Sequence, residues 1–330
     1  MDEGSLVLLV LIVLLALAFD YVNGFHDTAN AIATTVSTRA LTPGAAVALA
    51  ALLNVAGALS GTAVAETIGG KLVNPELVTK STVVAALLGA IFWNLATWWL
   101  GIPSSSSHAL IGGIIGAVGT SSGLDVLNWP GVTQIVSGLI ISPMLGFGVG
   151  LAVMLTLFRL VRKSTPGRIN HKFRKLQVLS ACLMAFSHGS NDAQKSMGII
   201  TMALMGSGYL RQMEVPLWVI LACATAMGLG TLAGGWRIIK TLGSRIFRLE
   251  PINGFAADLA SSLVIYSASS LGLPVSTTHV VASSILGVGT AKRPKGVKWG
   301  IAAQIITAWF ITIPASGIVA AIIYKMMTWN

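Results

Sequence analysis

Long apolar runs alternate with short polar connections over the whole 330-residue chain. Six runs of membrane length lie near 5–22, 44–66, 80–100, 132–158, 216–238 and 299–325. Shorter segments rich in Gly, Ser, Thr and Asn lie at 24–38, 102–121, 187–206 and 274–291, and a further span lies at 255–272. Since a transmembrane helix needs roughly 20 apolar residues, the pattern predicts an all-α polytopic membrane protein. We expect about ten to twelve membrane segments, some of them interrupted or re-entrant helices.

Composition supports this prediction. Hydrophobic residues make up 54% of the chain and charged residues only 10%, whereas soluble proteins carry roughly 25% charged residues. Cys182 and Cys223 both lie in apolar runs, so neither a disulfide framework nor a metal-binding spacing is indicated. The first apolar run follows two acidic residues and lacks a clear cleavage site, so we interpret it as a retained span rather than a signal peptide.

The formal net charge of +10 is concentrated between the apolar segments. The basic clusters lie within 159–175, 237–248 and 292–298, and the positive-inside rule places all three in the cytoplasm. No soluble basic face is indicated, so a nucleic-acid partner is not expected. The chain before Arg39 lacks Lys and Arg, which predicts that the N-terminus lies outside. We predict that the C-terminus also lies outside. Each half then crosses the membrane an odd number of times, and the two halves are inverted.

The two halves also resemble each other in sequence. GFHDTANAIATT at 24–35 matches GSNDAQKSMGII at 189–200, and LGIPSSSSH at 100–108 matches LGLPVSTTH at 271–279. We therefore predict a first inverted repeat over 1–160, a basic cytoplasmic linker over 161–175 and a second inverted repeat over 176–330. Inverted repeats with interrupted polar helices at matching positions are typical of secondary transporters.

Buried carboxylates are the first candidates for coupling chemistry, because ionisable groups at membrane depth usually face a cavity or a partner. The repeat pairs Asp27 with Asp192, and Asp258 lies in a later span. These three, with the flanking amides of Asn23 and Asn191, are predicted to bind a coupling cation or proton. An interhelical polar lock is the alternative. The neighbouring Gly24 and Gly189 predict a locally unwound backbone that frees ligand groups beside a cavity.

The duplicated proline motifs predict two helix starts, because Pro103 and Pro274 end the preceding helices and capping residues follow. Helix N-termini with free N–H groups favour an anion, so two related starts are expected to converge on one tetrahedral oxyanion. Packing of Ser and Thr between helices is the alternative. The residues assigned to anion binding are Ser105, Ser106, Ser107, Ser276, Thr277, Thr278, Asn30, Thr28, Gln194 and Lys195.

Four histidines lie in the same motifs. His26 and His188 precede the aspartates, and His108 and His279 end the proline motifs. Each is expected either to contact the anion or a proton, or to hold the structure by a hydrogen bond. Lys195 matches Asn30 of the first repeat, and an ammonium there would occupy the space of a cation or neutralise Asp192 or the substrate. This difference favours proton coupling over sodium coupling.

At these motifs the chain resembles the inorganic phosphate transporter (PiT) family, and NGFHDTANAIATT and SHGSNDAQKS look most like its bacterial low-affinity branch. The resemblance implies a homodimer of inverted repeats around a central phosphate site. It also implies functional roles for Asp27, Asn30, Asp192 and Asp258, and symport of phosphate or a neutral metal-phosphate complex. Sulfate permeases belong to the same superfamily, so sulfate is an alternative substrate.

The expected function is therefore secondary active transport of inorganic phosphate with H⁺ or Na⁺ in the plasma membrane, by alternating access. Entry of a dianion against a membrane potential of 100 mV costs about 4.6 kcal/mol, so phosphate would leak out of the cell through a passive channel. An intramembrane serine hydrolase is disfavoured because the polar set is duplicated, whereas a catalytic site needs one nucleophile. No enzyme activity and no cofactor are expected, and lipid is the surrounding partner; whether a metal is carried stays open.

Overall fold

The computed structural model describes residues 3–73 and 78–329, and these residues form helices and connecting turns without a β-strand. The α-helices of the first half are α1 Glu3–Ser37, α2 Pro43–Ala58, α3 Ala63–Lys71, α4 Lys80–Leu100, α5 Ser106–Ser121 and α6 Trp129–Val161. Those of the second half are α7 Pro166–Gly206, α8 Leu217–Ala233, α9 Trp236–Lys240, α10 Pro251–Ser270, α11 Thr277–Lys292 and α12 Trp299–Met327. Short 3₁₀ or π turns are η2 Leu124–Val126, η3 Thr241–Arg245 and η4 Pro294–Gly296.

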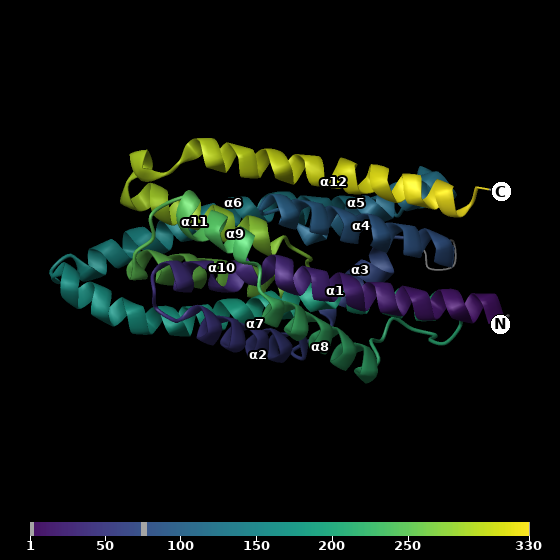
Figure 1. The fold of residues 1–330 in the computed structure, drawn as a ribbon, viewed down its shortest axis with the longest axis horizontal. Coiled ribbons are helices and arrows are strands. Elements are labelled where there is room, and N and C mark those ends of the chain that lie inside the picture. Colours follow the sequence, from purple (N-terminus) through teal and green to yellow (C-terminus); the bar gives the residue numbers. More distant parts are fainter. Residues whose placement is uncertain (1–2, 74–77, 330) are drawn as a thin grey trace.

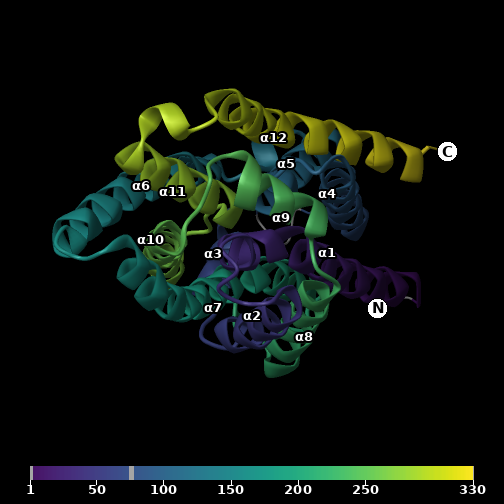
Figure 2. The same ribbon diagram turned by 60° about the vertical axis from the view of Figure 1, so that its left-hand side comes forward.

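The helices form an elongated bundle in which α1 and α7 run through the middle in opposite directions (Figure 1). Both termini lie at one end of the bundle, and the turn between α6 and α7 lies at the other end. In the turned view, α2, α7 and α8 lie on one side of α1, and α4, α5 and α12 lie on the other (Figure 2). Large apolar side chains such as Phe310 (75% exposed) and Leu271 (73%) cover the outside, as expected for a lipid-facing surface.

Packing between the two halves is reciprocal. Helix α1 packs on α8 while α7 packs on α2, and α5 packs on α12 while α11 packs on α6. Within each half, α1 contacts α4 and α7 contacts α10. Equivalent helices of the two halves therefore contact equivalent partners, and the core contains helices of both halves.

The predicted unwinding at Gly24 and Gly189 is wrong, because α1 and α7 are continuous helices of 35 and 41 residues. The glycines serve close packing instead. A Cβ on Gly189 would come within 2.1 Å of the Asn54 carbonyl oxygen on α2, and a Cβ on Gly24 within 2.5 Å of the Met227 carbonyl oxygen on α8. Because neither glycine has a side chain, the crossing helices approach to backbone contact.

The interruptions occur elsewhere. The apolar runs 44–66 and 216–238 are each a bent helix pair, α2 with α3 at 66° and α8 with α9 at 60°. Helices α5 and α11 have 16 residues each, fewer than a full crossing needs. By length and composition, four helices in the described residues are able to cross a membrane, or six if each bent pair is one span. The chain is a multi-pass helical membrane protein.

Two apolar clusters flank a polar layer. One cluster contains Leu9–Phe19 side chains of α1 together with α4 and α5, and the other contains Ala29–Ala33 of α1 together with α10 and α11. Between them, the buried side chains of α1 are mostly polar, from Asp20 to Thr28. Burial of polar groups in apolar surroundings is costly unless they bond one another, so this layer is where a site is expected.

Candidate ion-binding site

The two helix starts predicted from the proline motifs are present and meet in the polar layer. Ser105 caps α5 by accepting a hydrogen bond from the His108 backbone N–H at 3.1 Å, and Ser276 caps α11 in the same way from His279 at 3.2 Å. The Ser107 hydroxyl donates to the Val275 carbonyl oxygen at 3.0 Å, which joins one start to the segment before the other. Two positive helix ends therefore face a common region.

Asp27 of α1 is held by groups from both helix starts. Ser106 Oγ of α5 donates to its Oδ2 at 3.3 Å, and Thr278 Oγ1 of α11 donates to its Oδ1 at 3.2 Å. The neighbouring His26 places Nδ1 2.6 Å from the same Oδ1. The carboxylate is 1% exposed, so these groups rather than water stabilise it.

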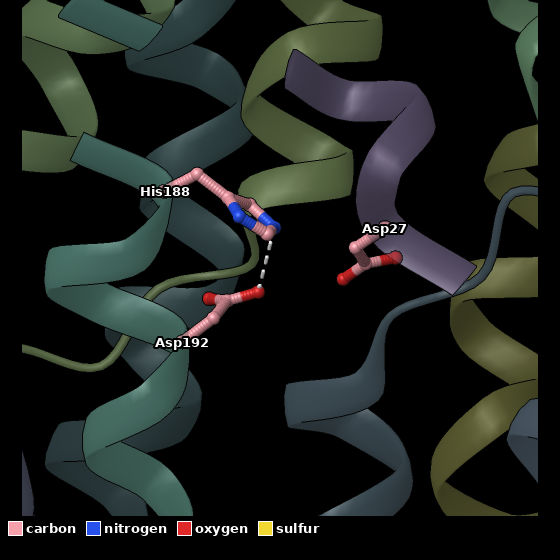
Figure 3. A group of neighbouring side chains, drawn as sticks. All are labelled: Asp27, His188 and Asp192. Carbon is pink, nitrogen blue, oxygen red and sulfur yellow. Dashed lines mark ion pairs between the residues drawn. The ribbon is translucent and has the colours of Figure 1, made fainter. Parts of the chain in front are cut away.

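Asp192 of α7 has a matching environment. Lys195 Nζ lies 2.6 Å from its Oδ1, Thr277 Oγ1 donates to its Oδ2 at 3.0 Å, and His188 Nε2 lies 3.2 Å from Oδ2. Figure 3 shows Asp27 facing Asp192 with the His188 ring between the two helices. Atoms of these three side chains lie within 4.8 Å of one another, a spacing that suits one bound cation.

Asn30 and Lys195, the residues paired by the repeat, both reach this cluster. Asn30 Nδ2 donates to Thr278 Oγ1 at 2.9 Å and lies 3.4 Å from Thr277 Oγ1. Lys195 is 1% exposed and is paired with Asp192. The cluster thus holds two carboxylates, one ammonium, two imidazoles and several hydroxyls in a space closed to solvent, which is an arrangement for ions rather than for apolar cargo.

Gln194 and Thr28, which are predicted to bind the anion, bond backbone groups instead of the two central carboxylates. Gln194 Oε1 accepts from the backbone N–H groups of Val64 and Ala65 at 2.7 and 3.2 Å, so its amide caps the start of α3. Thr28 Oγ1 donates to the Gly24 carbonyl at 2.6 Å and lies 3.3 Å from the Thr231 carbonyl. Both side chains are engaged by backbone groups and hold neighbouring helices together.

Asp258 of α10 is separate from the central pair. Its carboxylate accepts from Thr34 Oγ1 at 2.7 Å and from Ser180 Oγ at 3.4 Å. Thr34 lies seven residues after Asp27 on α1, about 10 Å along the helix axis. Asp258 therefore forms a second polar contact toward the α6–α7 end of the bundle.

The flanking amides differ in their contacts. The Asn191 amide contacts Ser269 Oγ at 2.9 Å, and in its better orientation it also donates to the Val275 carbonyl at 3.1 Å and to Asp192 at 3.2 Å. Neither amide atom of Asn23 has a hydrogen-bond partner among the described residues, although the side chain is fully buried. Asn191 thus belongs to the central cluster, whereas Asn23 lies beside it.

The histidines divide into two pairs. His26 and His188 contact the carboxylates, and His188 Nδ1 also lies 3.1 Å from Asn54 Oδ1 of α2. The rings of His108 and His279 are tilted relative to each other with their centroids 4.4 Å apart, and His279 stacks on Trp309 at 3.9 Å. This second pair lines a mainly apolar cavity of about 710 Å³ between α6 and α12, away from the carboxylates.

Asn54 is a site residue that the sequence did not reveal. It orients His188 and donates from Nδ2 to Thr231 Oγ1 of α8 at 2.9 Å, so it joins three helices behind Asp192. The only signal was a single amide within the apolar run 44–66. Residues 119–123 (GTSSG) match the G-x-S-x-G pattern of a hydrolase nucleophile elbow. Ser121 ends α5 and the segment before it is helical, so the strand-to-helix turn of such an elbow is not formed.

Comparison with known proteins agrees with this picture. The model of the phosphate transporter family matches residues 23–320. A protein of Bacillus subtilis (strain 168) named "Probable low-affinity inorganic phosphate transporter" is 50% identical over 98% of both chains, and one of Rhizobium meliloti (strain 1021) with the same name is 46% identical over 96% of both. A solved structure titled "The sodium-dependent phosphate transporter" superposes with a TM-score of 0.87 at 25% identity and covers 97% of this chain and 99% of its own. These relatives are transporters and not enzymes, and the chain belongs to the phosphate transporter family.

Proposed function

We propose that this protein is a symporter that carries inorganic phosphate together with protons by alternating access. The observation that carries the proposal is the cluster in which hydroxyls from both helix starts, Ser106, Thr277 and Thr278, donate to the paired carboxylates Asp27 and Asp192. Hydroxyl donors and helix N-termini suit a tetrahedral oxyanion. The carboxylates suit its accompanying cations.

Coupling follows from the shared donors. Phosphate oxygens and the two carboxylates compete for the same hydroxyl groups, and like charges in a site of low dielectric repel each other strongly. Phosphate therefore binds only when positive charge neutralises both Asp27 and Asp192, and Lys195 supplies that charge beside Asp192. When phosphate leaves, its negative charge no longer attracts the cations, so phosphate and cations are released on the same side. This mutual dependence is what symport requires.

Protons are favoured over sodium ions because of Lys195. Its ammonium lies 2.6 Å from Asp192 and already supplies one fixed positive charge where a sodium ion would otherwise bind. The similar solved structure is titled a sodium-dependent transporter, so sodium is the alternative coupling ion. Sulfate is the alternative substrate, since it is also a tetrahedral oxyanion and the donors recognise this shape.

The proposed topology has inverted repeats over 1–160 and 176–330, joined by the basic segment 161–175. Reciprocal packing of the halves and the opposite directions of α1 and α7 support the inversion (Figure 1). The basic segment is largely helical, since α7 begins at Pro166. We place it on the cytoplasmic side of the plasma membrane, with both termini outside, and we expect a homodimer; light scattering in detergent tests the dimer.

The central test is uptake of radiolabelled phosphate into proteoliposomes under an imposed pH gradient, a sodium gradient or neither. We expect accumulation with the pH gradient and little without a cation gradient. Equal uptake under all conditions would contradict symport and favour a channel. Competition by unlabelled sulfate and arsenate ranks the oxyanions.

Replacement of Asp27 by Asn is expected to lower accumulation by about a hundredfold or more, because one carboxylate of the coupling pair is lost. The matched control is Asp125→Asn, which changes an exposed carboxylate on η2 in the same way. Normal transport by the Asp27→Asn protein would show that the site assignment is wrong.

A further inference from the structure

A third carboxylate, Asp20, is buried on α1 outside the central cluster. Its Oδ1 accepts from Ser196 Oγ of α7 at 2.7 Å. Its Oδ2 has no hydrogen-bond partner among the described residues, and the side chain is 0% exposed. Asp20 precedes Asp27 by seven residues, about 10 Å toward the end of the bundle that holds both termini.

Asn23 lies between these two carboxylates on the same face of α1. Residues 20, 23, 27, 30 and 34 follow the three- and four-residue spacing of one helix face, so they form a polar stripe from Asp20 to Thr34. Both amide atoms of Asn23 lack partners in the part of the chain that the structure describes. Two adjacent buried side chains with unused polar atoms on one stripe are expected to bind something during the functional cycle, because orphaned polar groups in a membrane protein are costly.

Asp20 differs from the central carboxylates in its charge balance. Asp27 has His26, and Asp192 has Lys195 and His188, within ion-pair distance. No such partner reaches Asp20 among the described residues. Asp20 therefore lacks the basic neighbours that both central carboxylates have.

The helices around Asp20 supply few other charges. On α7, Lys195 and Asp192 are paired with each other, and on α8 the titratable residue is Cys223. On α4, the titratable residue is Lys80, which bonds Ser5 near the start of α1. Protonation lowers the free-energy cost of burying a lone carboxylate of this kind.

We propose that Asp20 carries a proton during the transport cycle, with Asn23 accepting the hydrogen bond of the protonated carboxyl. This inference rests on the proposed function. The proton binds Asp20 Oδ2 to form an O–H group and is released from the same oxygen when the carboxylate regains contact with water. Asp20 then resembles Asp258, which accepts from Thr34, seven residues after Asp27 on α1, and is also held by hydroxyl donors.

The test separates coupling from phosphate binding by two assays on the full-length protein in proteoliposomes. One measures accumulation of labelled phosphate driven by a pH gradient, with proton entry followed by a trapped pH dye. The other measures exchange of labelled for unlabelled phosphate at equal pH, which needs no net proton movement. We expect Asp20→Asn to lower accumulation and proton entry about tenfold or more while exchange stays within about twofold of wild type.

Three variants control this result. Asp20→Glu retains a carboxyl and is expected to restore coupling in part, and Asp125→Asn on the surface is expected to have no effect. Ser196→Ala removes the hydrogen bond between α1 and α7 but leaves the carboxyl, so it is expected to retain coupling. If Asp20 were only an interhelical lock, Ser196→Ala and Asp20→Asn would lower both assays equally, and that outcome overturns the proposal.

Other outcomes are equally decisive. Wild-type accumulation and proton-to-phosphate ratio in the Asp20→Asn protein would overturn the proton role. So would a sodium-driven uptake that the same variant abolishes, since the site would then take sodium. A wild-type protein that accumulates no phosphate under any gradient would instead contradict the proposed function itself.

Discussion

At the scale of residues, one helix start ties together carboxylates of both halves. Thr277 donates to Asp192 and Thr278 donates to Asp27, so two consecutive residues of α11 contact one carboxylate from each half. Hydrogen bonds to charged groups contribute about 1.5–3 kcal/mol each. A small shift of α11 therefore changes the environment of both carboxylates at once, which gives the site a direct connection between ion occupancy and helix position.

Lys195 is the residue on which the coupling ion depends. We expect Lys195→Asn to lower uptake driven by a pH gradient about tenfold and to introduce stimulation by sodium, because the fixed charge beside Asp192 is replaced by a cation ligand. Removing one partner of a buried pair also costs about 3–5 kcal/mol of stability unless a cation takes its place.

Uptake with and without sodium, together with thermal melts of the detergent-purified protein in both media, measures the two effects. Lys163→Asn, at the exposed α6–α7 turn, is the control. Unchanged proton-driven uptake in the Lys195 variant, without sodium stimulation, would contradict the role of the ammonium.

The sequence located most of the central residues because the duplication marks them. Asp27, Asp192 and the hydroxyls after the prolines recur in both halves, and Ser105 and Ser276 cap helices as predicted. Thr28 and Gln194 lie beside Asp27 and Lys195 in the sequence. On a continuous helix, consecutive residues point about 100° apart, so neighbours of a site residue face other helices.

At the scale of elements, the two central helices gain their close contacts from glycine. Within an apolar segment, a glycine permits either a break or a close crossing, and only the position of the partner helix distinguishes them. The partners of Gly24 and Gly189 lie in the opposite half of the chain, on α8 and α2. The lengths of apolar runs therefore predicted where helices lie, but not which of them stay straight.

Gly189→Ala is expected to destabilise the protein, because its Cβ would meet the Asn54 backbone at 2.1 to 2.7 Å and push α2 from α7. Overpacking of this kind costs about 1–3 kcal/mol, and it also displaces the amide that orients His188. We expect a melting temperature lower by about 4 °C or more and reduced uptake.

Gly167 gives a matched control in the same helix, since a Cβ there meets nothing within 4 Å. Gly167→Ala is expected to leave the melting temperature unchanged or to raise it slightly through helix propensity. Equal melting temperatures for the two variants would contradict the packing role of Gly189.

At the scale of the whole molecule, reciprocal packing is broken at one pair of interfaces. Helix α12 lies close on α4, where a Cβ on Gly89 would come 2.7 Å from that of Ala320 and Trp93 Nε1 donates to Thr312 Oγ1 at 3.1 Å. The matching helices α6 and α10 leave a groove of about 480 Å³ that extends to Val275, next to the α11 start. Two halves with equivalent neighbours but unequal packing are expected to have a second state in which the inequality is reversed.

This exchange predicts that fixing the closed interface stops transport. In a background with Cys182→Ser and Cys223→Ala, the pair Trp93→Cys and Thr312→Cys joins α4 to α12 through a short thiol-reactive cross-linker. We expect the linked protein to lose phosphate accumulation, because α12 can no longer leave α4, and the reduced protein to regain it.

Ile141→Cys with Leu263→Cys, on opposite walls of the groove, is expected to react only with a longer linker or during turnover with phosphate. Transport at the unlinked rate by the α4–α12 linked protein would show that these interfaces do not exchange, and the asymmetry would then be a fixed feature of the fold.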